Sequence, residues 1–116
     1  MKKVDTFTAT IYVGRKYRYN GKHISLRKTK KIIQEYVDAV GLCVTVTPTE
    51  YIYKNGREKG VTVGLINYPR FPSTEPFIKE QAIELAGLLL KGCRQMRVSV
   101  VFPDETVMLS AEGAGE

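Results

Sequence analysis

The densest group of side chains able to do chemistry lies early in the chain, where cations alternate with tyrosines. Residues 15–22 contain four basic side chains and two tyrosines. Ammonium and guanidinium groups bind phosphates, and tyrosine rings stack on bases. We therefore predict that an anionic ligand is bound by Arg15, Lys16, Tyr17, Arg18, Tyr19, Lys22 and Lys30. A basic loop that only keeps the protein soluble is the alternative.

The charge distribution favours an anionic partner. The formal net charge is +6, yet residues 1–31 alone contain ten basic side chains and one acidic side chain, which gives +9. The remaining 85 residues carry eight basic and eleven acidic groups, which gives −3. A basic first quarter on a weakly acidic body is typical of proteins that attract a nucleic acid or a nucleotide.

A second candidate surface is the segment 67–72, in which two prolines flank an arginine and a phenylalanine. Tyrosine, phenylalanine and arginine often dominate protein interfaces, so we predict partner contacts for Tyr68, Arg70 and Phe71. The alternative is a structured crossover in which the Phe71 ring is buried against Phe77 and Ile78 while Arg70 stays in solvent.

Catalytic and metal-binding motifs are absent from the sequence. It has one histidine, no Gly-x-Ser-x-Gly, no Gly-x-x-x-x-Gly-Lys and no spaced carboxylate pair. His23 lies in a polar loop, and Asp104 and Glu105 are interpreted as turn residues. Cys43 and Cys93 lack a Cys-x-x-Cys spacing and cannot complete a zinc site with one histidine. We therefore expect no catalytic residue, no metal and no cofactor, and we expect the protein not to be an enzyme.

The elements that would position these residues follow from hydrophobic periodicity and from helix caps. Two strands are predicted over 5–13 and 42–54, and a helix between them begins after Ser25 and ends at Gly41. A turn over 55–60 leads to a strand over 61–68. A second helix begins after Ser73 or Thr74 and ends at Gly92, and strands follow over 96–102 and 106–109.

This order predicts an α+β protein with a ferredoxin-like βαββαβ plan, an antiparallel sheet, two helices on one face and a short extra C-terminal strand. Pro48 predicts an edge position or a bulge. Residues 1–110 are predicted to form a single domain, and residues 111–116 a frayed tail. The open sheet face would be polar but β-branched, which, with so small a core, predicts a homo-oligomer.

Two families share this plan. An RNA-recognition domain needs aromatic side chains on its third strand, and residues 61–66 supply none. Acylphosphatases hold phosphate in the loop after the first strand, where this chain has Gly14-Arg15-Lys16 without the longer glycine-rich motif. Asn55 and Asn67 are available to orient a water molecule, although nothing in the sequence places them. A small phosphate-handling enzyme therefore remains the weakest of the alternatives.

In general type, the chain resembles small proteins of phages and other mobile elements. That resemblance implies a protein that acts by binding. The first expectation is a non-catalytic binding protein for an anionic partner, a nucleic acid or a nucleotide, through the basic first quarter. The alternative is an inhibitor or adaptor that binds a host protein through residues 67–72 or the open sheet face. A cytoplasmic location without membrane contact is expected, because no apolar run is long enough to span a membrane.

Overall fold

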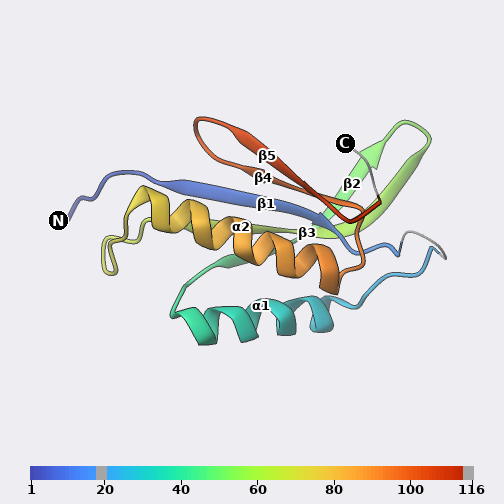
Figure 1. Cartoon of the computed structure of the whole chain (residues 1–116), viewed down its shortest axis with the longest axis horizontal. Coiled ribbons are helices and arrows are strands. Elements are labelled where there is room, and N and C mark those ends of the chain that lie inside the picture. Colours follow the sequence, from blue (N-terminus) through green and yellow to red (C-terminus); the bar gives the residue numbers. More distant parts are fainter. Residues whose placement is uncertain (18–20, 114–116) are drawn as a thin grey trace.

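The structure is a computed structural model that describes residues 1–17 and 21–113. Its elements follow the predicted order, with an extra strand at the C-terminal end (Figure 1). They are β1 (Thr8–Gly14), α1 (Leu26–Val40), β2 (Thr45–Tyr53), β3 (Gly56–Ile66), α2 (Glu75–Gly92), β4 (Arg97–Val101) and β5 (Thr106–Ser110). The predicted α+β, ferredoxin-like class is confirmed.

The described strands form one antiparallel sheet in the order β2-β3-β1-β4-β5. The two helices lie on the same side of this sheet (Figure 1). Strand alternation points Ala9, Ile11 and Val13 of β1 towards the helices, where each is at most 1% exposed. The opposite face of β1 carries Thr10 and Tyr12, and neither helix covers it.

The helix boundaries follow from their caps. The Ser25 hydroxyl accepts a hydrogen bond from the Lys28 amide at 3.1 Å, and Gly41 ends α1 with a φ of 78°. Thr74 caps α2 in the same way by accepting from the Phe77 amide. The last residue of α2 is Gly92, where the sequence also places the end of this helix.

The hairpin between β2 and β3 corrects one predicted boundary. The strands pair from Thr45 with Gly64 to Tyr53 with Gly56, so residues 56–60 belong to β3 and not to a turn. The chain reverses at Asn55, whose φ of 61° is in the left-handed region that asparagine tolerates. β2 is an edge strand, so the predicted edge position of Pro48 is confirmed.

The division into a domain over residues 1–110 and a frayed tail stays a prediction. The Ala111 amide still donates to the Met96 carbonyl at 2.7 Å, and residues 114–116 lie outside the described part of the chain.

Candidate functional site

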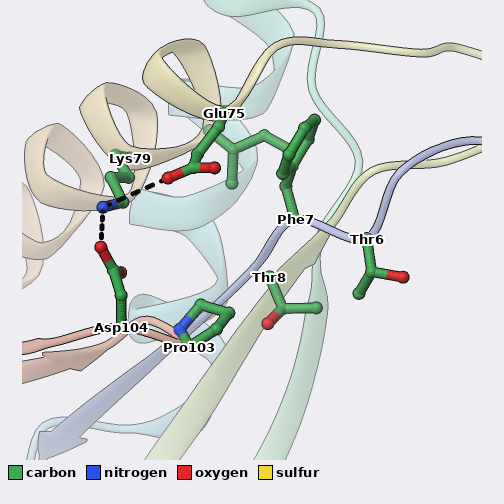
Figure 2. Close-up of a pocket in the computed structure, with 8 residues that line it drawn as sticks. Thr6, Phe7, Thr8, Glu75, Lys79, Pro103 and Asp104 are labelled. Carbon is green, nitrogen blue, oxygen red and sulfur yellow. Dashed lines mark hydrogen bonds and ion pairs between the residues drawn. The ribbon is translucent and has the colours of Figure 1, made fainter.

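A cavity of about 140 Å³ opens at the end of the sheet where β1 begins (Figure 2). Three segments that are far apart in the sequence line it: the start of β1, the first turns of α2 and the turn between β4 and β5. Its lining residues are Thr6, Phe7, Thr8, Glu75, Ile78, Lys79, Pro103 and Asp104. The cavity therefore joins an apolar wall to hydroxyl, carboxylate and ammonium groups.

Asn67 holds two walls of this cavity in place. Its side-chain amide donates to the Asp5 carbonyl at 2.8 Å, and its side-chain oxygen accepts from the Ser73 amide at 2.7 Å. Its own backbone amide donates to the Phe7 carbonyl at 3.0 Å. The side chain is only 8% exposed. One buried amide thus ties the segment before β1 to the segment before α2, a role that the sequence did not reveal.

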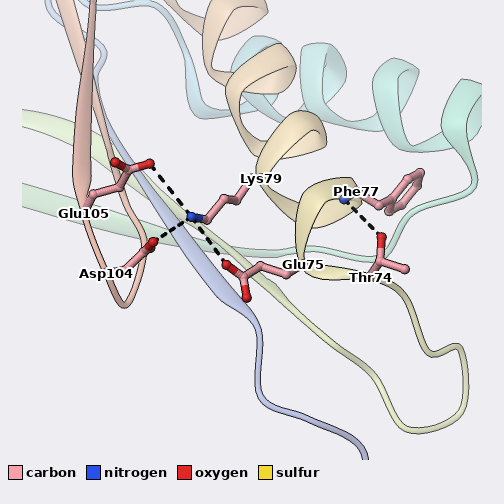
Figure 3. A network of polar contacts seen from close by, with 6 residues as sticks. All are labelled: Thr74, Glu75, Phe77, Lys79, Asp104 and Glu105. Carbon is pink, nitrogen blue, oxygen red and sulfur yellow. Dashed lines mark hydrogen bonds and ion pairs between the residues drawn. The ribbon is translucent and has the colours of Figure 1, made fainter.

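Lys79 is the centre of the charged groups at the cavity (Figure 3). Its ammonium lies 2.8 Å from the Asp104 carboxylate, 3.5 Å from Glu75 and 3.8 Å from Glu105. The ring of Phe102 lies beneath it, with its centroid 5.3 Å from the nitrogen. The hydrogen bond to Asp104 raises the pKa of Lys79 and lowers the pKa of Asp104. The Asp104 carboxyl is therefore ionised at neutral pH, and the four groups together carry a net charge of −2.

A second cavity, of about 430 Å³, lies next to the first along the start of β1. The two cavities share Thr6, Phe7 and Thr8. Ile66, Asn67 and Pro69 form part of its wall, and Lys2 and Lys3 lie at its side. The combined space suits a small molecule with a flat apolar part, hydroxyl groups and a charged end.

Five of the seven residues of the predicted basic site lie within the described part of the chain, and their binding of an anionic ligand stays a prediction. The Arg15 guanidinium donates to the backbone carbonyls of Ile24 at 2.9 Å and Gly60 at 3.4 Å, so it supports the fold. Lys16 pairs with His23 through the backbone, and Lys30 is exposed on α1. Lys22 also interacts with another group of the protein. Arg18 and Tyr19 lie outside the described residues.

Tyr17 lies next to Lys22, because its backbone amide donates to the Lys22 carbonyl at 2.6 Å. The Arg94 guanidinium lies 5.0 Å from its ring centroid, beside a shallow cavity of about 350 Å³ that is also lined by Lys28 and Lys31. This cavity adjoins the C-terminal end of α2, whereas Glu75 begins the helix. A helix of 18 residues is about 27 Å long. The sequence-predicted cations and the cavity at the start of β1 are therefore separate features.

The segment 67–72 forms a tight turn in which the Phe71 amide donates to the Tyr68 carbonyl at 2.9 Å. The prediction that the Phe71 ring is buried is wrong, because Phe71 is 64% exposed. The Arg70 guanidinium lies 5.4 Å from that ring. A groove of about 490 Å³ runs beside it, where a hydrogen bond between the Tyr68 and Cys43 side chains raises the pKa of Tyr68. Partner contacts for Tyr68, Arg70 and Phe71 stay a prediction.

The exposure of Phe71 has a measurable consequence for stability. Replacing it with alanine is expected to lower the free energy of unfolding by less than about 1 kcal/mol, as for surface side chains, because water already covers most of the ring. Urea unfolding of the variant beside the parent protein measures this. A loss of about 3 kcal/mol, typical of core aromatics, would show that the ring is buried in solution.

Two further properties concern the described residues as a set. In residues 1–17 and 21–113, no group of three or more histidine, cysteine, aspartate or glutamate side chains could hold a metal ion. In the same ranges, neither helix is long and apolar enough to cross a membrane.

Comparisons with known proteins give matches in structure alone. Neither a protein family nor a curated protein sequence matches the chain. A phage SAM lyase in complex with S-methyl-5′-thioadenosine matches with a TM-score of 0.70 and 18% identity, over 97% of both chains. A phage SAM lyase in the apo state matches with a TM-score of 0.72 and 16% identity, over 97% of this chain and 96% of the other. These likenesses show a shared fold.

The comparisons overturn the functional expectation from the sequence. A non-catalytic binding protein for a nucleic acid or nucleotide, with a host-protein inhibitor as its alternative, was expected, but both similar structures are of a lyase, which is an enzyme. The expectation that the protein is not an enzyme is contradicted by the same finding. The resemblance to phage proteins is confirmed in so far as both neighbours in structure are phage proteins.

Proposed function

We propose that this chain is an enzyme, a lyase that cleaves S-adenosylmethionine and releases S-methyl-5′-thioadenosine. The observation that carries the proposal is the likeness in fold to SAM lyase structures over nearly the whole of both chains. A fold does not fix an activity by itself. The second support is therefore the chemistry of the cavity between Phe7, Glu75 and Asp104.

The charge of this cavity suits the substrate. S-adenosylmethionine carries a positively charged sulfonium between an adenosine and an amino-acid part, and that part has an ammonium and a carboxylate group. The carboxylates of Glu75, Asp104 and Glu105 outnumber the Lys79 ammonium, so an excess of negative charge remains for a bound cation. Attraction between opposite charges is stronger in a partly enclosed cavity than in open water, because the effective dielectric constant there is lower.

The size of the two neighbouring cavities suits the rest of the molecule. A cavity of about 140 Å³ is smaller than the roughly 300–1,000 Å³ that is usual for small-molecule sites. The neighbouring cavity of about 430 Å³ adds the missing space along Thr6 and Thr8. In this proposal the sulfonium lies near the carboxylates, and the nucleoside extends across the threonine hydroxyls towards Ile66.

The reaction needs no water as a co-reactant. The bond from the sulfonium sulfur to the amino-acid side chain breaks, and sulfur keeps both electrons and becomes a neutral thioether. The four-carbon fragment is balanced either by closing its own carboxylate oxygen onto the released carbon or by losing a proton from the adjacent carbon. In the second route an ionised carboxylate of the cluster would accept that proton.

The proposal is tested by incubating the purified chain with S-adenosylmethionine and separating the products by chromatography. S-methyl-5′-thioadenosine is expected to accumulate with time and with protein concentration. S-adenosylhomocysteine, which lacks the methyl group and the sulfonium charge, is the matched control and is expected to remain intact. The absence of both product formation and S-adenosylmethionine binding would contradict the proposal.

Self-association also stays a proposal. The uncovered face of the sheet carries apolar side chains that are more than a third exposed, which are Tyr12, Ile66, Val101 and Met108. Their register places them on one face, since Tyr12 pairs with Ser99, which pairs in turn with Met108. A second copy covering this face would remove apolar surface from water.

A further inference from the structure

We infer that Lys79 is a positioning residue, which holds the carboxylates of Glu75 and Asp104 on two sides of the cavity so that they can receive the cationic end of the substrate. This inference rests on the proposed function. In this role Lys79 itself does not contact the reacting atoms.

The first argument is the difference in exposure within the cluster. The Lys79 side chain is 25% exposed, whereas the side chains of Glu75, Asp104 and Glu105 are 50%, 59% and 58% exposed. A half-exposed carboxylate rotates freely unless a partner restrains it, because long polar side chains lose entropy when they are fixed. The more covered Lys79 ammonium is the fixed point on which the three carboxylates converge.

The second argument is that Lys79 is itself held by two elements (Figure 3). Its backbone belongs to the second turn of α2, and its ammonium lies over the ring of Phe102, at the end of β4. The turn that follows is closed by a hydrogen bond from the Phe102 amide to the Glu105 carbonyl at 2.8 Å. One lysine therefore connects the helix wall of the cavity to the wall formed by the β4–β5 turn.

The third argument is electrostatic. Three carboxylates within 4 Å of one point repel one another, and the Lys79 ammonium offsets part of that repulsion. Its neutralisation is incomplete, so the cluster keeps a net charge of −2 and still attracts a cation. Without Lys79 the carboxylates would separate and turn towards water, and they would no longer face the cavity together.

A second role for Lys79 fits the same geometry, and the two roles predict opposite results. If the ammonium merely occupied the place of the substrate cation, removing it would strengthen substrate binding. If it positions the carboxylates, removing it weakens binding. The sign of the change in affinity therefore decides between the two roles.

The test compares Lys79→Met with Lys79→Arg, and with Lys91→Met as the matched control on the last turn of the same helix, where the side chain is exposed. We expect Lys79→Met to lower kcat/KM for S-adenosylmethionine by about 10-fold to 100-fold, mainly through KM, because misplaced binding groups cost that much. Lys79→Arg should retain most activity, and Lys91→Met all of it. Tighter substrate binding by Lys79→Met would overturn the inference.

A second measurement does not depend on activity. The carboxyl pKa of Asp104, followed by NMR in the ligand-free protein, is expected to rise in Lys79→Met and to stay unchanged in Lys91→Met, since the hydrogen bond from Lys79 holds it low. If the parent protein neither binds nor cleaves S-adenosylmethionine, the proposed function fails, while this titration still decides whether Lys79 organises the carboxylates. An unchanged Asp104 pKa would refute the positioning role in either case.

Discussion

Gly60→Ala is expected to destabilise the protein by about 3 kcal/mol, near the upper end of the cost of overpacking. A Cβ atom at this position would lie 2.4 Å from the Val13 carbonyl oxygen and 2.4 Å from the ring of Tyr51. Gly60 lies in β3, between β1 and β2, and pairs with Gly14 on one side and Thr49 on the other. The clash is therefore with backbone that two ladders of hydrogen bonds hold in place.

The matched control is the same substitution at Gly87, within α2. A Cβ atom there would meet nothing within 4 Å, and alanine is favoured over glycine in a helix interior by about 1 kcal/mol. Gly87→Ala should therefore raise the midpoint of urea unfolding, whereas Gly60→Ala should lower it. Equal midpoints for Gly60→Ala and the parent protein would show that the strands can separate enough to admit a methyl group.

The fold was predictable because its signals are local. Alternating apolar residues such as Ala9, Ile11 and Val13 predict a half-buried strand, and Ser25 and Gly41 mark the ends of a helix. The close approach at Gly60 was not predictable, since it depends on the Tyr51 ring and on the register of three strands. The turn over residues 55–60 was misplaced for a related reason: glycines that read as turn residues are paired within β3.

The candidate site was not predictable, because its residues look ordinary in their local context. Asp104 and Glu105 follow a proline and resemble any polar turn, and Lys79 with Glu75 resembles an exposed helical pair. The antiparallel topology brings the β4–β5 turn beside the first turns of α2, and only that contact turns the carboxylates into a cluster. The sequence also does not show that the Arg15 guanidinium donates hydrogen bonds to two backbone carbonyls.

Replacing Glu75 and Asp104 together with glutamine and asparagine is expected to lower kcat/KM for S-adenosylmethionine by about 100-fold or more. The amides keep the shape of the carboxylates but remove two negative charges that line the cavity, and losses of this size are typical when preorganised electrostatic groups are removed. Both side chains are half exposed, so the double variant should still fold. Product formation and binding of S-adenosylmethionine are measured in parallel with the unfolding midpoint.

The pH profile and a control variant complete this test. Because the hydrogen bond from Lys79 lowers the pKa of Asp104, that carboxylate stays charged until the pH falls below the ordinary aspartate range. The parent protein should therefore retain substrate affinity at mildly acidic pH and lose it as the pH falls through the lowered Asp104 pKa. The double variant should lack this dependence.

Glu84→Gln removes an exposed charge of α2 that does not line the cavity, so it should behave like the parent. If the double variant cleaves S-adenosylmethionine at the parent rate, the reaction occurs elsewhere on the protein. Cleavage of a cationic substrate held by these two carboxylates has to slow when both charges are removed.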